Sequence, residues 1–95
     1  MATRDWWLVS YDVRDDRRLR ETARLLEGYG ERVQYSVFRC QLTRTEIARL
    51  RWELEKLLED VDDLLVIPLC SRCARSVSDS KSRTWGGQPP PYRLV

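Results

Sequence analysis

Hydrophobic residues gather in two dense runs and one alternating segment along the chain. The first run, Trp6 to Val13, is apolar almost to its end and predicts a central strand covered on both faces. The last run, Leu64 to Leu69, predicts a second buried strand, and its Pro68 places that strand at a sheet edge or at a break in the ladder. Residues Glu31 to Leu42 alternate in polarity, which predicts either one long strand or two short strands joined near Ser36.

Two amphipathic helices are predicted between these strands. The first covers Arg17 to Glu27, with Asp15 or Asp16 as its N-cap. The second begins at a capping box, in which Thr43 is the cap and Glu46 reaches back to it. Apolar residues recur at helical spacing in both segments, at Leu19, Ala23 and Leu26 in the first and at Ile47, Leu50, Leu54, Leu57 and Leu58 in the second. Each helix therefore has one face to bury against the strands.

Strand, helix, extended pair, helix and strand is the order of the ferredoxin-like βαββαβ fold. This α+β architecture places two helices on one face of an antiparallel sheet. The chain of 95 residues does not supply material to cover the opposite face, so we expect a homodimer in which a second sheet covers it. We expect one domain over residues 1–78. Residues 79–95, which are rich in Ser, Gly and Pro, are expected to form a C-terminal extension that docks on a partner subunit or protein.

Arginine supplies almost all of the positive charge, because Lys56 and Lys81 are the only lysines among 17 basic residues. Arginine suits bidentate contact with phosphate or carboxylate, but a GC-rich genome or a hot habitat produces the same bias, so arginine content alone decides nothing. The chain has no histidine, so any activated water must depend on a metal ion or a carboxylate. No stretch is apolar enough to span a membrane and Met1 to Asp5 is not a signal peptide, so we expect a cytoplasmic protein.

Candidate chemistry is concentrated after the first strand, where Asp12, Asp15 and Asp16 lie close to Arg17 and Arg18. Phosphoryl chemistry needs a divalent cation and guanidinium groups, and this short stretch offers ligands for the first and supplies the second. An acid between a strand and a helix is also commonly a cap, and on spacing alone that interpretation is favoured for the three acids. The helix dipole disfavours cations at a helix start, a cost that phosphate binding would explain, although solvated surface arginines explain the pair equally well.

The three cysteines, Cys40, Cys70 and Cys73, are an odd number, which argues against a secreted disulfide framework. The spacing of Cys70 and Cys73 is that of half a zinc knuckle or of a redox pair. A closed zinc site needs four ligands, which two copies could share across a dimer axis. Buried or incidental thiols at a strand end are the favoured interpretation.

Four stretches of the chain resemble the second family of CRISPR-associated (Cas) proteins, the small proteins of the adaptation step. They are the strand end Tyr11-Asp12-Val13, the helix start Asp15-Asp16-Arg17-Arg18, the run Gly-Glu-Arg-Val-Gln-Tyr-Ser-Val-Phe at residues 30–38, and the strand end Pro68-Leu69-Cys70. The long run is specific, since runs of such mixed chemistry rarely recur by chance. The resemblance covers residues 6–78.

The resemblance implies a ferredoxin-like homodimer that is a magnesium-dependent endoribonuclease, with some family members cutting double-stranded DNA. It also implies a partner, the dimeric CRISPR integrase, in a heterotetrameric or heterohexameric complex for spacer integration. The family's metal-binding aspartate falls on Asp12 and its neighbouring tyrosine on Tyr11, which makes both residues catalytic candidates and Asp12 the candidate Mg²⁺ ligand. The resemblance thus reverses the preference for capping at Asp12, but not at Asp15 or Asp16.

The resemblance assigns nucleic-acid binding to the basic helix start and the central strand, at Arg17, Arg18, Arg20, Arg32 and Phe38. Magnesium is usually held by one or two carboxylates with waters and substrate phosphate, so Asp12 of one chain is a thin site that a second copy would complete. The resemblance equally allows an alternative function, a non-catalytic homodimeric adaptor that bridges integrase dimers and binds spacer DNA.

Overall fold

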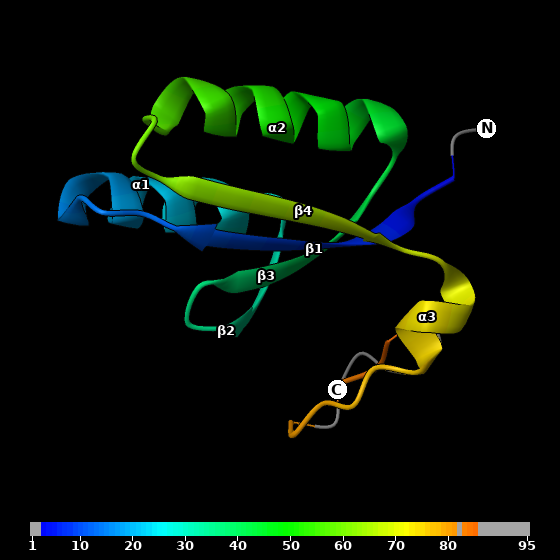
Figure 1. The fold of residues 1–95 in the computed structure, drawn as a ribbon. Coiled ribbons are helices and arrows are strands. Elements are labelled where there is room, and N and C mark those ends of the chain that lie inside the picture. The colour runs from blue at the N-terminus through cyan, green and yellow to red at the C-terminus, as the bar shows by residue number, and fades with distance from the viewer. Residues whose placement is uncertain (1–2, 82, 86–95) are drawn as a thin grey trace.

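The computed structural model describes residues 3–81 and 83–85 and has the predicted element order, with one short helix added (Figure 1). Its elements are β1 (Asp5–Asp12), α1 (Asp16–Glu27), β2 (Gly30–Gln34), β3 (Val37–Leu42), α2 (Arg44–Leu57), β4 (Asp63–Leu69) and α3 (Ser71–Arg75). The strands form one antiparallel sheet in the order β2-β3-β1-β4, and α1 and α2 lie together on one of its faces. The predicted ferredoxin-like α+β fold is confirmed.

Residues 30–42 form a hairpin of two short strands. A tight turn follows Gln34, and the register between β2 and β3 shifts between Arg32 and Gln34, which breaks a simple alternation of side chains. Gly30 passes so close to the carbonyl group of Arg39 that a Cβ atom at this position would clash with it. The second of the two predicted arrangements for this segment is therefore the correct one.

Both helices begin at predicted caps. The side chain of Asp15, and not that of Asp16, caps α1 by accepting a hydrogen bond of 2.9 Å from the backbone N–H of Arg18. In α2, the Thr43 hydroxyl accepts from the Glu46 backbone N–H at 3.1 Å, while the Glu46 carboxylate accepts from the Thr43 backbone N–H at 2.9 Å. These bonds satisfy backbone donors that would otherwise have no partner where each helix begins.

Strand β4 lies at an edge of the sheet, which is the first of the two positions that Pro68 allowed. It pairs with β1, and Pro68 stands opposite Trp7. An edge strand tolerates proline because the ladder on its outer side does not need the missing N–H.

The core lies between the sheet and the helices α1 and α2. Its most deeply buried large side chains come from both layers and are Val9, Leu26, Phe38, Leu50 and Leu54. Along β1, Val9 and Tyr11 are buried in this core, so Ser10 and Asp12 project from the other face. Among the described residues, no helix has the length and the apolar character needed to cross a membrane.

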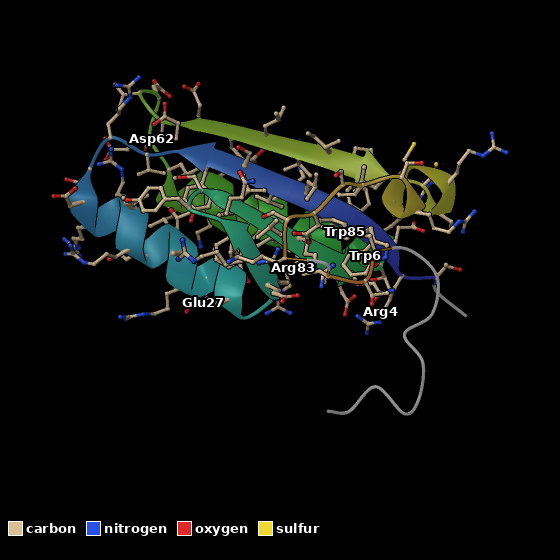
Figure 2. All side chains as sticks on the ribbon, turned by 90° about the horizontal axis from the view of Figure 1, so that it is seen from below. Arg4, Trp6, Glu27, Asp62, Arg83 and Trp85 are labelled. Atoms are coloured by element: carbon tan, nitrogen blue, oxygen red, sulfur yellow. The ribbon has the colours of Figure 1, made fainter. Side chains whose placement is uncertain are left out.

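The sheet face away from α1 and α2 is called the open face here. By strand register and alternation, its residues are Trp6, Leu8, Ser10 and Asp12 of β1, Val37, Arg39 and Gln41 of β3, and Asp63, Leu65, Ile67 and Leu69 of β4. Helix α3 and the segment after it run beneath this face, and Trp85 lies beside Trp6 (Figures 1 and 2). One end of the open face is therefore covered by the chain itself.

Arg39 joins the open face to the C-terminal segment. Its guanidinium carbon lies 4.9 Å from the ring centroid of Trp6 and 4.7 Å from that of Trp85. The same group pairs with Glu31 at 2.8 Å and donates to the carbonyl oxygen of Thr84 at 2.6 Å. This sandwich, called the tryptophan clamp below, buries a charged side chain whose donors are satisfied.

Asp79 stabilises the segment of chain that leads to Trp85 and the tryptophan clamp. Its carboxylate accepts hydrogen bonds of 2.8 Å from the Trp85 indole, the Lys81 backbone N–H and the Arg83 guanidinium. The indole bond first, and then the other donors, hold the pKa of Asp79 well below its usual range. Within one chain, the first part of the predicted extension is thus attached to the sheet of its own domain through Thr84 and Trp85, which contact Arg39. Residues 86–95 lie outside the described residues.

Arg18 and Asp62 tie the start of α1 to the turn before β4. The Arg18 Nε and Nη2 atoms donate to the two carboxylate oxygens of Asp62 at 2.9 and 3.2 Å. Asp62 also accepts from the backbone N–H groups of Arg14 at 2.9 Å and Glu59 at 3.0 Å. The Arg18 guanidinium, followed by these two amides, holds the pKa of Asp62 well below its ordinary value.

We predict that this contact makes the chain less stable in acid. The pKa of Asp62 is lower in the folded chain than in the unfolded chain, where it is about 4. Such a carboxyl group stabilises the fold at pH values above its unfolded-state pKa. This contribution is lost as the pH falls toward the folded-state pKa. Asp62→Asn should therefore lower the free energy of unfolding at neutral pH and flatten its decline between about pH 5 and pH 2, measured by urea unfolding. Asp60→Asn, exposed in the same turn, is the matched control, and equal effects of the two substitutions would contradict the prediction.

Candidate functional site

Asp12 closes β1 on the open face. Its side chain is 65% exposed, and the Arg14 guanidinium lies 3.8 Å from its carboxylate. The sheet register pairs Asp12 with Asp63, the first residue of β4. Directly paired residues of antiparallel strands project from the same face, so both carboxylates are presented at this end of the sheet.

Asp63 is a candidate site residue that sequence reasoning missed. The apolar run that begins at Leu64 predicted a strand starting there, whereas β4 begins at Asp63. The available signal was the pair Asp62-Asp63 directly before that run. Which of these two acids faces Asp12 depends on the pairing register, and that register became known only with the fold.

The donor chemistry of Asp12 and Asp63 suits magnesium, which prefers carboxylate and water oxygens. Within residues 3–81 and 83–85, no three His, Cys, Asp or Glu side chains come together in a way that could hold a metal ion. One chain therefore offers at most two carboxylates here. Completing an octahedral site would require water, substrate phosphate or a second chain.

Tyr11 lies on the opposite face of β1 from Asp12. Its side chain is buried in the core, and its ring centroid is 6.2 Å from that of Phe38. Burial raises the pKa of the Tyr11 phenol, because the phenolate would lose water, and the charge of Arg32 partly opposes this effect. Tyr11 and Asp12 are both catalytic candidates, but their side chains therefore lie on opposite faces of the sheet.

The three candidate arginines of α1 have different surroundings. Arg17 is exposed and pairs with Glu21 at 3.1 Å, one helical turn away. Arg20 is exposed on the same helix. Arg18 is only 18% exposed, and its charge is compensated by Asp62. Arg17 and Arg20 thus remain accessible to an incoming phosphate, whereas Arg18 supports the fold.

Arg32 and Phe38 contact each other at the start of the hairpin's return strand. The Arg32 guanidinium lies 5.0 Å from the Phe38 ring centroid and donates to the carbonyl oxygen of Tyr35 at 2.5 Å. Phe38 is fully buried, so in this chain its ring fills the core and presents no surface on which a base could stack. Arg32 is exposed at the edge of the sheet.

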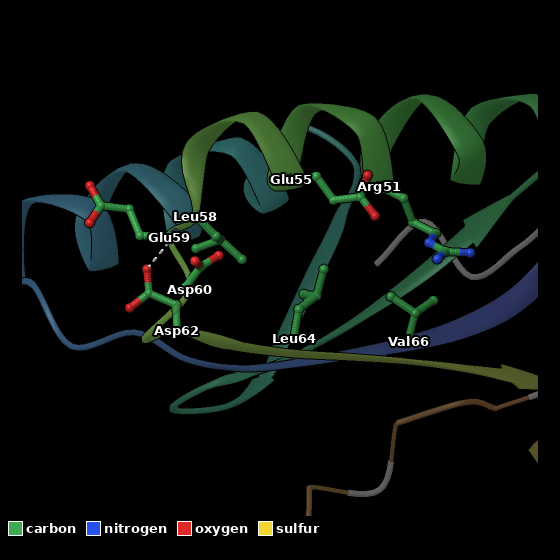
Figure 3. Close-up of a pocket in the computed structure, with 8 residues that line it drawn as sticks. All are labelled: Arg51, Glu55, Leu58, Glu59, Asp60, Asp62, Leu64 and Val66. Atoms are coloured by element: carbon green, nitrogen blue, oxygen red, sulfur yellow. Dashed lines mark hydrogen bonds between the residues drawn. The ribbon is translucent and has the colours of Figure 1, made fainter.

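A groove of about 470 Å³ lies between α2 and β4 (Figure 3). Its lining residues are Arg51, Glu55, Leu58, Glu59, Asp60, Asp62, Leu64 and Val66. Four carboxylates against one guanidinium make this groove unsuitable for a polyanion. Exposed guanidinium groups lie on other surfaces, at Arg14, Arg17 and Arg20.

Comparison with known proteins gives consistent matches over most of the chain. Residues 5–77 match the family model described as CRISPR associated protein Cas2. The chain is 40% identical over 93 residues to CRISPR-associated endoribonuclease Cas2 3 of Synechocystis sp., which covers 94% of this chain and 96% of that relative. It is 47% identical over 60 residues to CRISPR-associated endoribonuclease Cas2 of Thermus thermophilus, covering 63% of this chain and 64% of the relative.

Solved structures with the same fold include Streptococcus pyogenes Cas2 at pH 6.5, with a TM-score of 0.70 and 33% identity, covering 77% of this chain and 95% of that one. A chain of a partial Cas6-RT-Cas1–Cas2 complex has a TM-score of 0.70 and 25% identity, covering 81% and 91%. The family model spans most of the chain, and the Synechocystis relative matches almost end to end. This chain therefore belongs to the family of CRISPR-associated protein Cas2.

Proposed function

We propose that this chain is a CRISPR adaptation protein that cleaves RNA, and on some substrates double-stranded DNA, in a magnesium-dependent reaction at Asp12. The observation that carries the proposal is the pair of carboxylates, Asp12 and Asp63, at the exposed end of two hydrogen-bonded strands. The relatives from Synechocystis and Thermus thermophilus, which are named CRISPR-associated endoribonucleases, support this activity.

A homodimer through the open faces is part of the proposal. Leu65 and Ile67 are 56% and 37% exposed, which leaves an apolar strip along β4, while Trp85 packs at the far end of the face. Leu65 stands opposite Ser10, two residues from Asp12. A second sheet that covered this strip would bring its own acids to the same interface.

The chemistry expected at this site follows from the groups on the open face. Magnesium held by Asp12 and Asp63 would supply a bound water of lowered pKa and neutralise charge on the scissile phosphate. Arg14 and Arg17 would contact the non-bridging phosphate oxygens. Both guanidinium groups are exposed, and that of Arg14 lies beside Asp12. Tyr11 contributes from the core, where its packing fixes the end of β1 and so the direction of Asp12.

The second candidate function is a non-catalytic homodimeric adaptor that holds spacer DNA and bridges dimers of the integrase Cas1. The observation in its favour is the likeness to a chain of a Cas1–Cas2 complex. The exposed positions of Arg17 and Arg20 also suit contact with a DNA backbone. Both functions use the same dimer, so one protein can perform both.

Asp12→Asn separates the two functions. The substitution keeps the size of the side chain but removes its charge. RNA cleavage should fall by about 100-fold or more, because the metal ion that Asp12 would hold supplies several kcal/mol of transition-state stabilisation. The assay follows labelled single-stranded RNA and double-stranded DNA with magnesium or with chelator. Asp16→Asn, a change at an exposed acid of the α1 start, should leave cleavage unaltered. Cleavage by Asp12→Asn at the rate of the unsubstituted protein would remove Asp12 as the catalytic site.

The arginines of α1 should separate binding from stability. Arg17→Ala and Arg20→Ala should each weaken duplex binding, measured by fluorescence anisotropy. Each substitution removes one guanidinium from the DNA phosphates, so the slope of log affinity against log salt concentration should become smaller by about 0.9. Neither change should alter the melting temperature. Arg18→Ala should lower the melting temperature, because Asp62 would lose its guanidinium partner. The assignment would be wrong if Arg18→Ala weakened binding as strongly as Arg17→Ala and left the melting temperature unchanged.

We also propose that the C-terminal residues 86–95, which include Tyr92 and Leu94, attach to Cas1. Truncation after Trp85 removes the proposed Cas1 contact but retains the tryptophan clamp. It should therefore reduce co-purification with Cas1 and leave the melting temperature unchanged. Truncation after Ser78 also removes Asp79 and Trp85 and should lower the melting temperature. If the chain that ends at Trp85 still binds Cas1 fully, this segment has no part in the attachment.

A further inference from the structure

Cys70 and Cys73 form a pair of neighbouring thiols that the proposed nuclease site does not use. Cys70 is the N-cap of α3, with φ −70° and ψ 166°, and its Sγ atom accepts the backbone N–H of Cys73 at 3.4 Å. Both side chains are exposed, and both are free thiols. The sulfur of Cys70 is thus folded over the first turn of α3, toward the residue with which it would have to bond.

The spacing of the pair is compatible with a disulfide. Side chains three positions apart at a helical turn have Cβ atoms about 5–6 Å apart, and a disulfide requires about 3.5–4.5 Å. Cys70 has extended backbone torsions outside the helix proper, so rotation about its own backbone bonds can bring its Cβ atom closer to that of Cys73. Ala74, which is fully buried, holds α3 against the rest of the fold while the two sulfurs remain at the surface.

The two thiols are chemically unlike each other. Hydrogen bonds from the Cys73 backbone and side chain lower the pKa of Cys70, so this residue is the better nucleophile. The neighbouring Cys70 sulfur in turn raises the pKa of Cys73. Cys40 provides the contrast, since burial in the core raises the pKa of its thiol to about 11. An attacking thiol and a resolving thiol at neighbouring positions are the arrangement that thiol–disulfide exchange requires.

We propose that Cys70 and Cys73 form a reversible intramolecular disulfide by exchange with a low-molecular-weight disulfide of the glutathione class. The Cys70 thiolate attacks one sulfur of that disulfide and releases one small thiolate. The Cys73 thiol then loses its proton and attacks the Cys70 sulfur, which releases the second small thiolate. Two protein thiols are thereby oxidised and one small disulfide is reduced to two thiols.

The position of the pair suggests what the disulfide changes. Cys70 follows the last residue of β4, and α3 leads into the segment that ends in the tryptophan clamp. Closure would fix the turn at which the chain leaves the sheet edge and enters the open face. The oxidised chain should therefore hold the clamp segment more firmly, and hydrogen exchange of residues 76–81 should be slower than in the reduced chain.

The test is a redox titration of the full-length chain. The protein is equilibrated in glutathione buffers of increasing oxidised fraction, quenched with acid, unfolded and alkylated, and its intact mass is measured. The mass should change from that of a chain with three alkylated thiols to that of a chain with one, at a single midpoint of the titration. The oxidised chain should carry no glutathione. Cys73→Ser should stop at a glutathione adduct on Cys70, because its resolving thiol is missing. Cys40→Ala is the matched control and should leave the transition at the same midpoint.

Several outcomes would overturn the proposal. Stable glutathione adducts on the unsubstituted chain would show that Cys73 does not resolve them. A disulfide between two chains, seen as a dimer in non-reducing electrophoresis, would show that the pair reacts across an interface. One zinc ion per two chains, retained through purification and protecting the thiols from oxidation, would identify a shared metal site in place of the redox pair.

Discussion

The pleat of β1 sends Val9 and Tyr11 into the core and turns Ser10 and Asp12 to the open face. This alternation has a period of two residues, so a slip of one position would bury Asp12 and expose the tyrosine. The buried residues under α1 and α2 hold the register in place. The chemical character of the open face therefore depends on hydrophobic packing on the other side of the sheet, and the position of the candidate acid is a consequence of core packing.

The two ends of the open face differ, because one is covered by the chain itself and the other is exposed. At one end, the tryptophan clamp places Arg39 between Trp6 and Trp85 and covers the sheet with the chain's own segment. At the other end, Asp12 and Asp63 remain exposed beside the apolar side chains of β4. The charges are divided in a similar way, since Arg18 is paired with Asp62 while Arg17 and Arg20 face solvent. Groups of the same chemical type thus differ in their surroundings, because some are paired and buried and others are exposed.

Much of the fold could be predicted from local patterns. Residues close together in the sequence were enough to predict three features: the buried strand β1, the capping box at Thr43 and the edge position of β4 at its proline. Helix α3 was missed because its five residues, Ser71–Arg75, are too few to show an apolar period. The contact of Arg39 with Trp85 joins residues far apart in the sequence, and no spacing rule predicts such a pair. Asp63 required the register of two strands, and within residues 3–81 and 83–85 no third carboxylate joins Asp12 and Asp63 in a possible metal site.

Pro68 has a consequence beyond marking the sheet edge. An edge strand that carries exposed apolar side chains can template the addition of strands from other molecules and so seed aggregation. At Pro68 the backbone has no N–H to offer an incoming strand, and β4 pairs with β1 on its protected side. A continuous ladder along this edge is interrupted at that position. The chain can therefore leave Leu65 and Ile67 available for association through their side chains while its backbone discourages growth into fibrils.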